Sequence, residues 1–69
     1  MTPTALRAAL SRLRLTQVEA GRLFGYDDGG RSVRRWLAGD NPIPPAVAVL
    51  IHLMLDGKVT VDDINSSFR

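Results

Sequence analysis

The sequence contains no cysteine, and this absence removes two common means of stabilising a small domain. Neither disulfides nor the usual cysteine-based zinc sites are available. A chain of 69 residues buries only about 60% of its unfolded surface, so apolar packing alone must hold a small core. The apolar content of 45% is typical of a globular protein. We therefore expect one packed domain over residues 1–69, which would gain stability from a partner chain.

Long hydrophobic runs are also missing. The longest apolar stretch covers residues 43–55, contains two prolines and His52, and is too short to span a bilayer. The N-terminus lacks the basic segment and apolar stretch of a secretory signal. A soluble, cytoplasmic protein without a membrane partner is the expectation.

The residues needed for catalysis or metal binding are scarce. His52 is the single histidine, and no nucleophile–base pair or glycine-rich phosphate loop accompanies it. Asp62 and Asp63 follow Thr60, where acidic side chains suit the start of a helix better than a metal site. We expect no enzyme activity, no cofactor, no metal and no small-molecule ligand.

Positive charge is concentrated in the first half of the chain. Residues 1–36 hold seven arginines and three acidic residues, a net charge of +4, whereas residues 37–69 carry −2. Eight of the nine basic residues are arginine, whose planar fork suits phosphates and guanine edges. The arginines could also serve only to keep the protein soluble. Their positions in the fold must decide between this role and nucleic-acid binding.

Every strong periodicity in the sequence is helical. In the first helix, Thr4 is the expected cap and the apolar stripe comprises Leu6, Ala9, Leu10 and Leu13. The second begins with a capping box, Thr16-Gln17-Val18-Glu19, and ends at Gly25, where a left-handed residue is favoured. Gly21 lies inside this helix at a cost of about 0.5–1 kcal/mol relative to alanine. We expect another stretch of backbone to approach it closely.

A third helix is expected from about Gly30 to Ala38, with Gly39 as its end. Successive residues are 100° apart on a helical wheel, so Val33, Trp36 and Leu37 share one apolar face. Arg31 and Arg35 then point directly away from that face, and Ser32 and Arg34 flank them. Trp36 is predicted to anchor the helix in the core.

The fourth helix, 46–55, is apolar almost all round. We expect one side to fill the core and Ile51 and Leu55 to remain on the other, covered by the tail or by a partner subunit. The core side is predicted to comprise Ala46, Val49, Leu50 and Leu53, and the tail stripe Val61, Ile64 and Phe68 after a cap at Thr60.

Two helices joined by a tight turn suggest a helix-turn-helix. The segments Leu15-Thr16-Gln17-Val18-Glu19-Ala20-Gly21-Arg22-Leu23-Phe24-Gly25 and Val33-Arg34-Arg35-Trp36-Leu37-Ala38-Gly39, followed by a proline-rich loop, resemble the Cro and phage-repressor family of DNA-binding domains. The resemblance covers residues 4–56, with 57–69 as a tail. It implies an all-α, lambda-repressor-like bundle of about five short helices.

The resemblance also implies a DNA-contacting surface. Gly30, Arg31, Ser32 and Arg35 would face base edges or the groove wall, and Thr16 and Gln17 would meet the phosphate backbone. Arg34, like Arg22, is expected on phosphates. The sequence departs from the family pattern in the turn, which is about two residues longer at 27–30 and contains two aspartates.

We therefore expect a transcriptional regulator, a phage or bacterial repressor that binds a palindromic operator in double-stranded DNA as a homodimer. Two alternatives remain open. The first is a protein-interaction module, antitoxin-like or an adaptor, whose arginines meet an acidic partner. The second is a recombination accessory protein that bends DNA.

Overall fold

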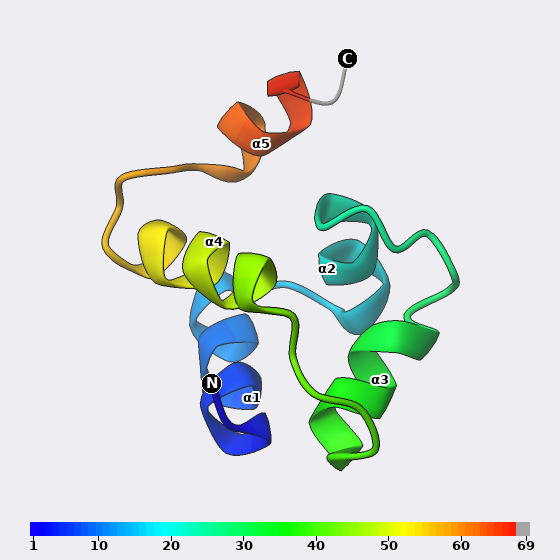
Figure 1. Ribbon diagram of the computed structural model, residues 1–69. Helices are drawn as coiled ribbons and strands as arrows, with labels where there is room; N and C mark the ends of the chain where they lie inside the picture. The colour runs from blue at the N-terminus through cyan, green and yellow to red at the C-terminus, as the bar shows by residue number, and fades with distance from the viewer. Residues whose placement is uncertain (68–69) are drawn as a thin grey trace.

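The computed structural model describes residues 1–67, and within them helices joined by turns and loops are the regular secondary structure (Figure 1). The predicted all-α bundle of about five short helices is confirmed. The helices are α1 (Pro3–Leu13), α2 (Gln17–Leu23), α3 (Arg31–Ala38), α4 (Pro45–Leu55) and α5 (Val61–Ser67). None of those helices combines the length and the apolar character that crossing a bilayer would require.

The core lies where α1, α3 and α4 meet. Its largest fully buried side chains are Leu6 of α1, Val33 of α3 and Ile51 of α4. Helix α2 packs against α3, and α5 follows α4 through an extended segment and packs against α2 (Figure 1). The same core includes Ile64, which attaches α5 to the bundle.

Helix α1 begins two residues earlier than the sequence predicts. Thr2 is the N-cap, and its hydroxyl oxygen accepts a hydrogen bond from the Ala5 N–H at 3.1 Å. The prediction of Thr4 as the cap is wrong, because Pro3 occupies the first helical position, where a missing N–H has no cost. The predicted apolar stripe is confirmed in Leu6, Ala9 and Leu10, all of which are buried.

Helix α2 begins with the predicted capping box. The Thr16 hydroxyl accepts from the Glu19 N–H, and the Glu19 carboxylate accepts from the Thr16 N–H, both at 3.1 Å. Hydrogen bonds to the Glu19 carboxylate, first from the Thr16 backbone N–H and then from the Thr16 hydroxyl, hold the pKa of Glu19 below its ordinary value. The helix closes with Gly25 at φ +87°, and the Tyr26 N–H donates to the Gly21 carbonyl at 2.7 Å.

The close approach expected at Gly21 is present. A β-carbon at this position would lie 2.7 Å from the Tyr26 carbonyl oxygen, closer than a side chain tolerates. The approaching backbone belongs to the turn after α2, whereas the nearest atom of α3 is a Val33 methyl group at 3.7 Å. The absence of a side chain at Gly21 therefore lets the turn fold back against α2.

The prediction for the faces of α4 is wrong. Ile51, expected on the spare side, has no exposed surface, and Val47 and Met54 join it in the core. Val49, expected inside, is 57% exposed. The helix is apolar almost all round, so its pattern carries little information about which side faces inward.

The tail forms α5 in the place that its pattern predicts. The Thr60 hydroxyl accepts from the Asp63 N–H at 3.1 Å, and the Asp63 carboxylate accepts from the Thr60 N–H at 2.9 Å. Ile64 is buried, whereas Val61 is 36% exposed. The predicted contribution of Phe68 lies outside the described residues.

Candidate nucleic-acid interface

The inner face of α3 is fixed by three apolar side chains. Val33, Trp36 and Leu37 expose 1%, 4% and 9% of their surface. The Tyr26 ring meets the Trp36 ring edge-on, with centroids 5.0 Å apart and planes at 86°. The prediction that Trp36 is a core anchor is confirmed, and the ring from the turn ties that turn to the helix.

The outer face of α3 carries three exposed arginines. Arg31, Arg34 and Arg35 line one surface hollow, and none of them forms an ion pair within residues 1–67. The predicted outward orientation of Arg31 and Arg35 is therefore confirmed, and Arg34 lies beside them. Three guanidinium groups without acidic partners among the described residues give this face a local excess of positive charge.

Gly30 does not lie on this face. It is buried, and a β-carbon there would be 3.1 Å from the Val18 backbone nitrogen and 3.3 Å from the Gln17 β-carbon. With φ at +86°, it forms the N-cap of α3 and lets the helix start directly against α2. The structure thus gives Gly30 a packing role in place of the predicted contact with a base edge or groove wall.

Ser32 is also held by the chain itself. Both its N–H, at 3.1 Å, and its hydroxyl donate to the same carboxylate oxygen of Asp28, and its side chain is half-buried. Gly30 has no side chain to cap α3, and Asp28 supplies the capping carboxylate from two residues earlier. For the predicted contact with DNA, the Ser32 hydroxyl would have to bind the DNA while it also donates to Asp28.

The longer turn also brings Asp27 toward α2. Its carboxylate lies 3.4 Å from the Arg22 Nε atom, and both side chains are largely exposed. Such a pair contributes little to stability, but it gives Arg22 an intramolecular partner. Each of the two additional aspartates therefore has a neighbouring group of its own, and neither is paired with the arginines of α3.

Thr16 and Gln17 lie at the other edge of this region. Both are exposed at the start of α2, and a β-carbon at Gly30 would lie 3.3 Å from the Gln17 β-carbon, so the starts of α2 and α3 are close together. The structure therefore brings the predicted phosphate-binding residues next to the helix that carries the arginines. The Thr16 hydroxyl accepts from the Glu19 N–H and also donates toward the Glu19 carboxylate, so a phosphate oxygen would compete for its proton.

Two residues of this region were not predicted from the sequence. Arg7 and Ser11 of α1 line a hollow together with Thr16 and Gln17. They are four residues apart and so share one face of α1, which was the available signal. The sequence alone does not show that the start of α2 lies beside this face of α1.

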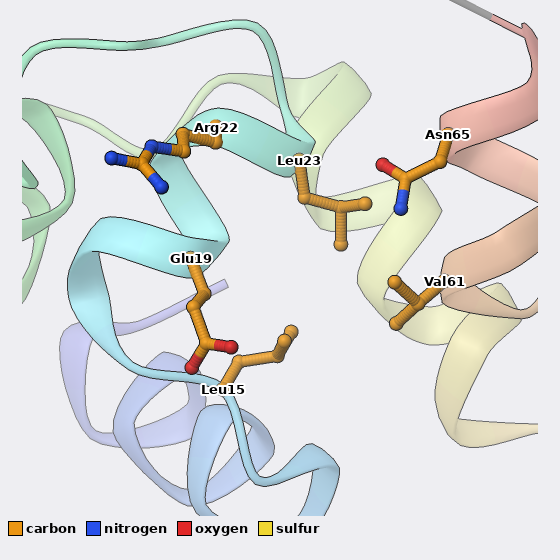
Figure 2. A pocket seen from close by; sticks show the side chains of 6 residues that line it. All are labelled: Leu15, Glu19, Arg22, Leu23, Val61 and Asn65. Carbon is orange, nitrogen blue, oxygen red and sulfur yellow. The ribbon is translucent and has the colours of Figure 1, made fainter.

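A different hollow lies between α2 and α5 (Figure 2). The Glu19 carboxylate belongs to the capping box, and Figure 2 shows the Arg22 guanidinium directed away from α5. The remaining lining residues are Leu15, Leu23, Val61 and Asn65. Among residues 1–67, no guanidinium or ammonium group is directed into this hollow.

Replacement of Asp28 by asparagine is expected to lower the Tm at pH 7, and this loss should shrink as the pH falls below the ordinary carboxyl pKa of about 4. Hydrogen bonds from the Ser32 hydroxyl and then from backbone N–H groups hold the pKa of Asp28 below its ordinary value. A carboxyl with a depressed pKa stabilises the fold above its unfolded pKa, and this contribution disappears as the pH falls through the folded value.

Thermal unfolding of the wild type and Asp28→Asn, followed by circular dichroism from pH 7 to pH 2, tests this prediction. Asp40→Asn is a matched control, since Asp40 is exposed and its carboxylate forms no hydrogen bond or ion pair within residues 1–67. An equal loss for Asp28→Asn at both ends of the pH range would show that the charge of the carboxylate is irrelevant.

Comparison of the chain with protein-family models, with curated protein sequences and with solved structures finds no match.

Proposed function

We propose that the chain is a sequence-specific DNA-binding transcriptional regulator that inserts α3 into the major groove. One observation carries the proposal. Arg31, Arg34 and Arg35 form an exposed cluster without acidic partners, on a helix whose opposite face is fixed in the core. A fixed helix presents its side chains in a reproducible geometry, which base reading requires.

The chemistry of arginine assigns a role to each member of the cluster. An arginine donates two parallel hydrogen bonds to the O6 and N7 atoms of guanine, worth about 1–3 kcal/mol of discrimination. Arg31 and Arg35 lie one turn apart and directly opposite the core face, so they read guanines. Arg34 lies to one side and contacts phosphates.

In this proposal, the protein represses transcription by occupying its operator. A protein bound over a promoter excludes polymerase, and a homodimer would read two half-sites about 34–36 Å apart, or a multiple of that. Val49 of α4 is 57% exposed and is one apolar residue available to a contact between copies, whereas Ile51 of the surface expected from the sequence is buried. Homodimerisation is part of the proposal and is tested by sedimentation with and without the selected DNA.

Selection from a randomised duplex library tests the function. We expect enrichment of a palindrome that contains guanine steps, and about 5- to 100-fold weaker binding of Arg35→Ala to it, in line with the loss of one bidentate contact. Binding of that variant to unrelated DNA should change much less. Equal losses on selected and unrelated DNA would refute base reading by Arg35.

The result also separates the alternatives. Weak, unselective binding that disappears as salt rises would mean that the arginines contact phosphates alone. No DNA binding at all would direct attention to an acidic protein partner. Strong distortion of the DNA without effect on a promoter would indicate an architectural role.

A further inference from the structure

A second polar hollow lies beside the arginine cluster of α3. It is lined by Arg7 and Ser11 of α1, by Thr16, the N-cap of α2, and by Gln17, the first residue of α2. Three leucines also line it, namely Leu10, Leu15 and Leu37. Residues that carry a guanidinium, two hydroxyls and an amide thus border one surface depression.

The donors of this hollow suit a phosphate group. No acidic residue lines it, and Arg7 forms no ion pair within residues 1–67. The hydroxyls and the amide can all donate to a phosphate oxygen, and the guanidinium adds charge and a fork of two N–H groups.

The hollow lies near the proposed DNA surface. A β-carbon at Gly30, the residue directly before Arg31, would lie 3.3 Å from the Gln17 β-carbon, so the start of α2 is close to the start of α3. Leu37, which lines the hollow, lies one turn after Arg34, and side chains three apart on a helix are neighbours. A DNA strand that passes the outer edge of α3 at Arg34 would therefore run toward the side of the bundle that carries Arg7.

We infer that Arg7, with Ser11, Thr16 and Gln17, binds a phosphodiester group of the DNA backbone next to the bases that α3 reads. The inference rests on the proposed function, and it adds α1 to the interface. Arg7 supplies affinity and fixes the register of α3, while it reads no base.

The test compares Arg7→Ala with Arg12→Ala across a salt series, on the selected duplex and on unrelated DNA. Arg12 is a matched control because it is exposed on α1 and lies about 140° away from Arg7 around the helix. For Arg7→Ala we expect a loss on the order of tenfold at low salt on both duplexes. The slope of log K against log salt should become shallower by about 0.9. Arg7→Lys should retain most of the affinity, because a phosphate accepts a point charge.

The outcomes distinguish this inference from the proposed function. If Arg35→Ala loses selectivity while Arg7→Ala matches Arg12→Ala, the phosphate site is wrong and the function stands. If Arg7→Ala loses affinity for the selected duplex alone, Arg7 reads bases and the assigned role is overturned. Failure of the wild type to bind DNA would overturn both. Thermal unfolding of each variant confirms that the losses arise from a folded protein.

Discussion

Replacement of Trp36 by alanine is expected to remove most of the stability of the domain. Truncation of a buried tryptophan costs about 3–5 kcal/mol, the lost transfer energy together with the cavity that remains. At roughly 0.05–0.15 kcal/mol per residue, the free energy of unfolding of this chain is about 3–10 kcal/mol. Trp36 exposes 4% of its surface and holds the Tyr26 ring, so little around it can collapse to fill the space.

Urea unfolding followed by far-ultraviolet circular dichroism measures this effect, since fluorescence is lost with the single tryptophan. Trp36→Phe is the control, because it retains an aromatic ring beside Tyr26 and should lose much less stability. DNA binding of Trp36→Ala should fall with the folded fraction. An unfolding midpoint for Trp36→Ala close to that of the wild type would show that α3 is not anchored as described.

Most of the correct predictions about the fold came from local signals, namely helix caps, helix ends and the spacing of apolar residues. The capping box at Thr16 and the end of α2 at Gly25 depend on neighbours within a few residues, and both are confirmed. Helix α3 alternates charged and apolar residues, so a helical wheel identifies its buried face. Helix α4 lacks that contrast, and its orientation is decided by the helices that pack on it. The burial of Ile51 could therefore not be read from the pattern.

The exposed arginines of the candidate site could be predicted from the sequence, whereas the residues packed around them could not. Arg31 and Arg35 follow from the wheel alone. The capping of α3 by Asp28 depends on how the longer turn folds, and the hollow at Arg7 depends on the packing of α1 beside the start of α2. Both are tertiary features, and single-sequence periodicity contains no information about them.

At Gly30, the family resemblance and the structure lead to different roles. The resemblance implied a position facing DNA, whereas the structure buries it between α2 and α3 at φ +86°. A side chain in the left-handed region costs about 1–2 kcal/mol. The added β-carbon would also meet the Val18 backbone nitrogen at 3.1 Å, and backbone atoms cannot turn aside as a flexible side chain can.

We therefore expect Gly30→Ala to lower the free energy of unfolding by about 2–4 kcal/mol, the sum of backbone strain and overpacking. Gly29→Ala is the matched control, because Gly29 also has a positive φ, +72°, and nothing lies within 4 Å of its added β-carbon. Gly29→Ala should therefore be destabilised by the backbone strain alone. Urea unfolding of both variants gives the difference, and equal losses would show that the contact with α2 is unimportant. Where Gly30→Ala remains folded, we expect α3 to be pushed away from α2. The DNA contacts proposed for the arginines of α3 and for Thr16 and Gln17 would then no longer fit one register. Binding to the selected duplex should then weaken more for Gly30→Ala than for Gly29→Ala.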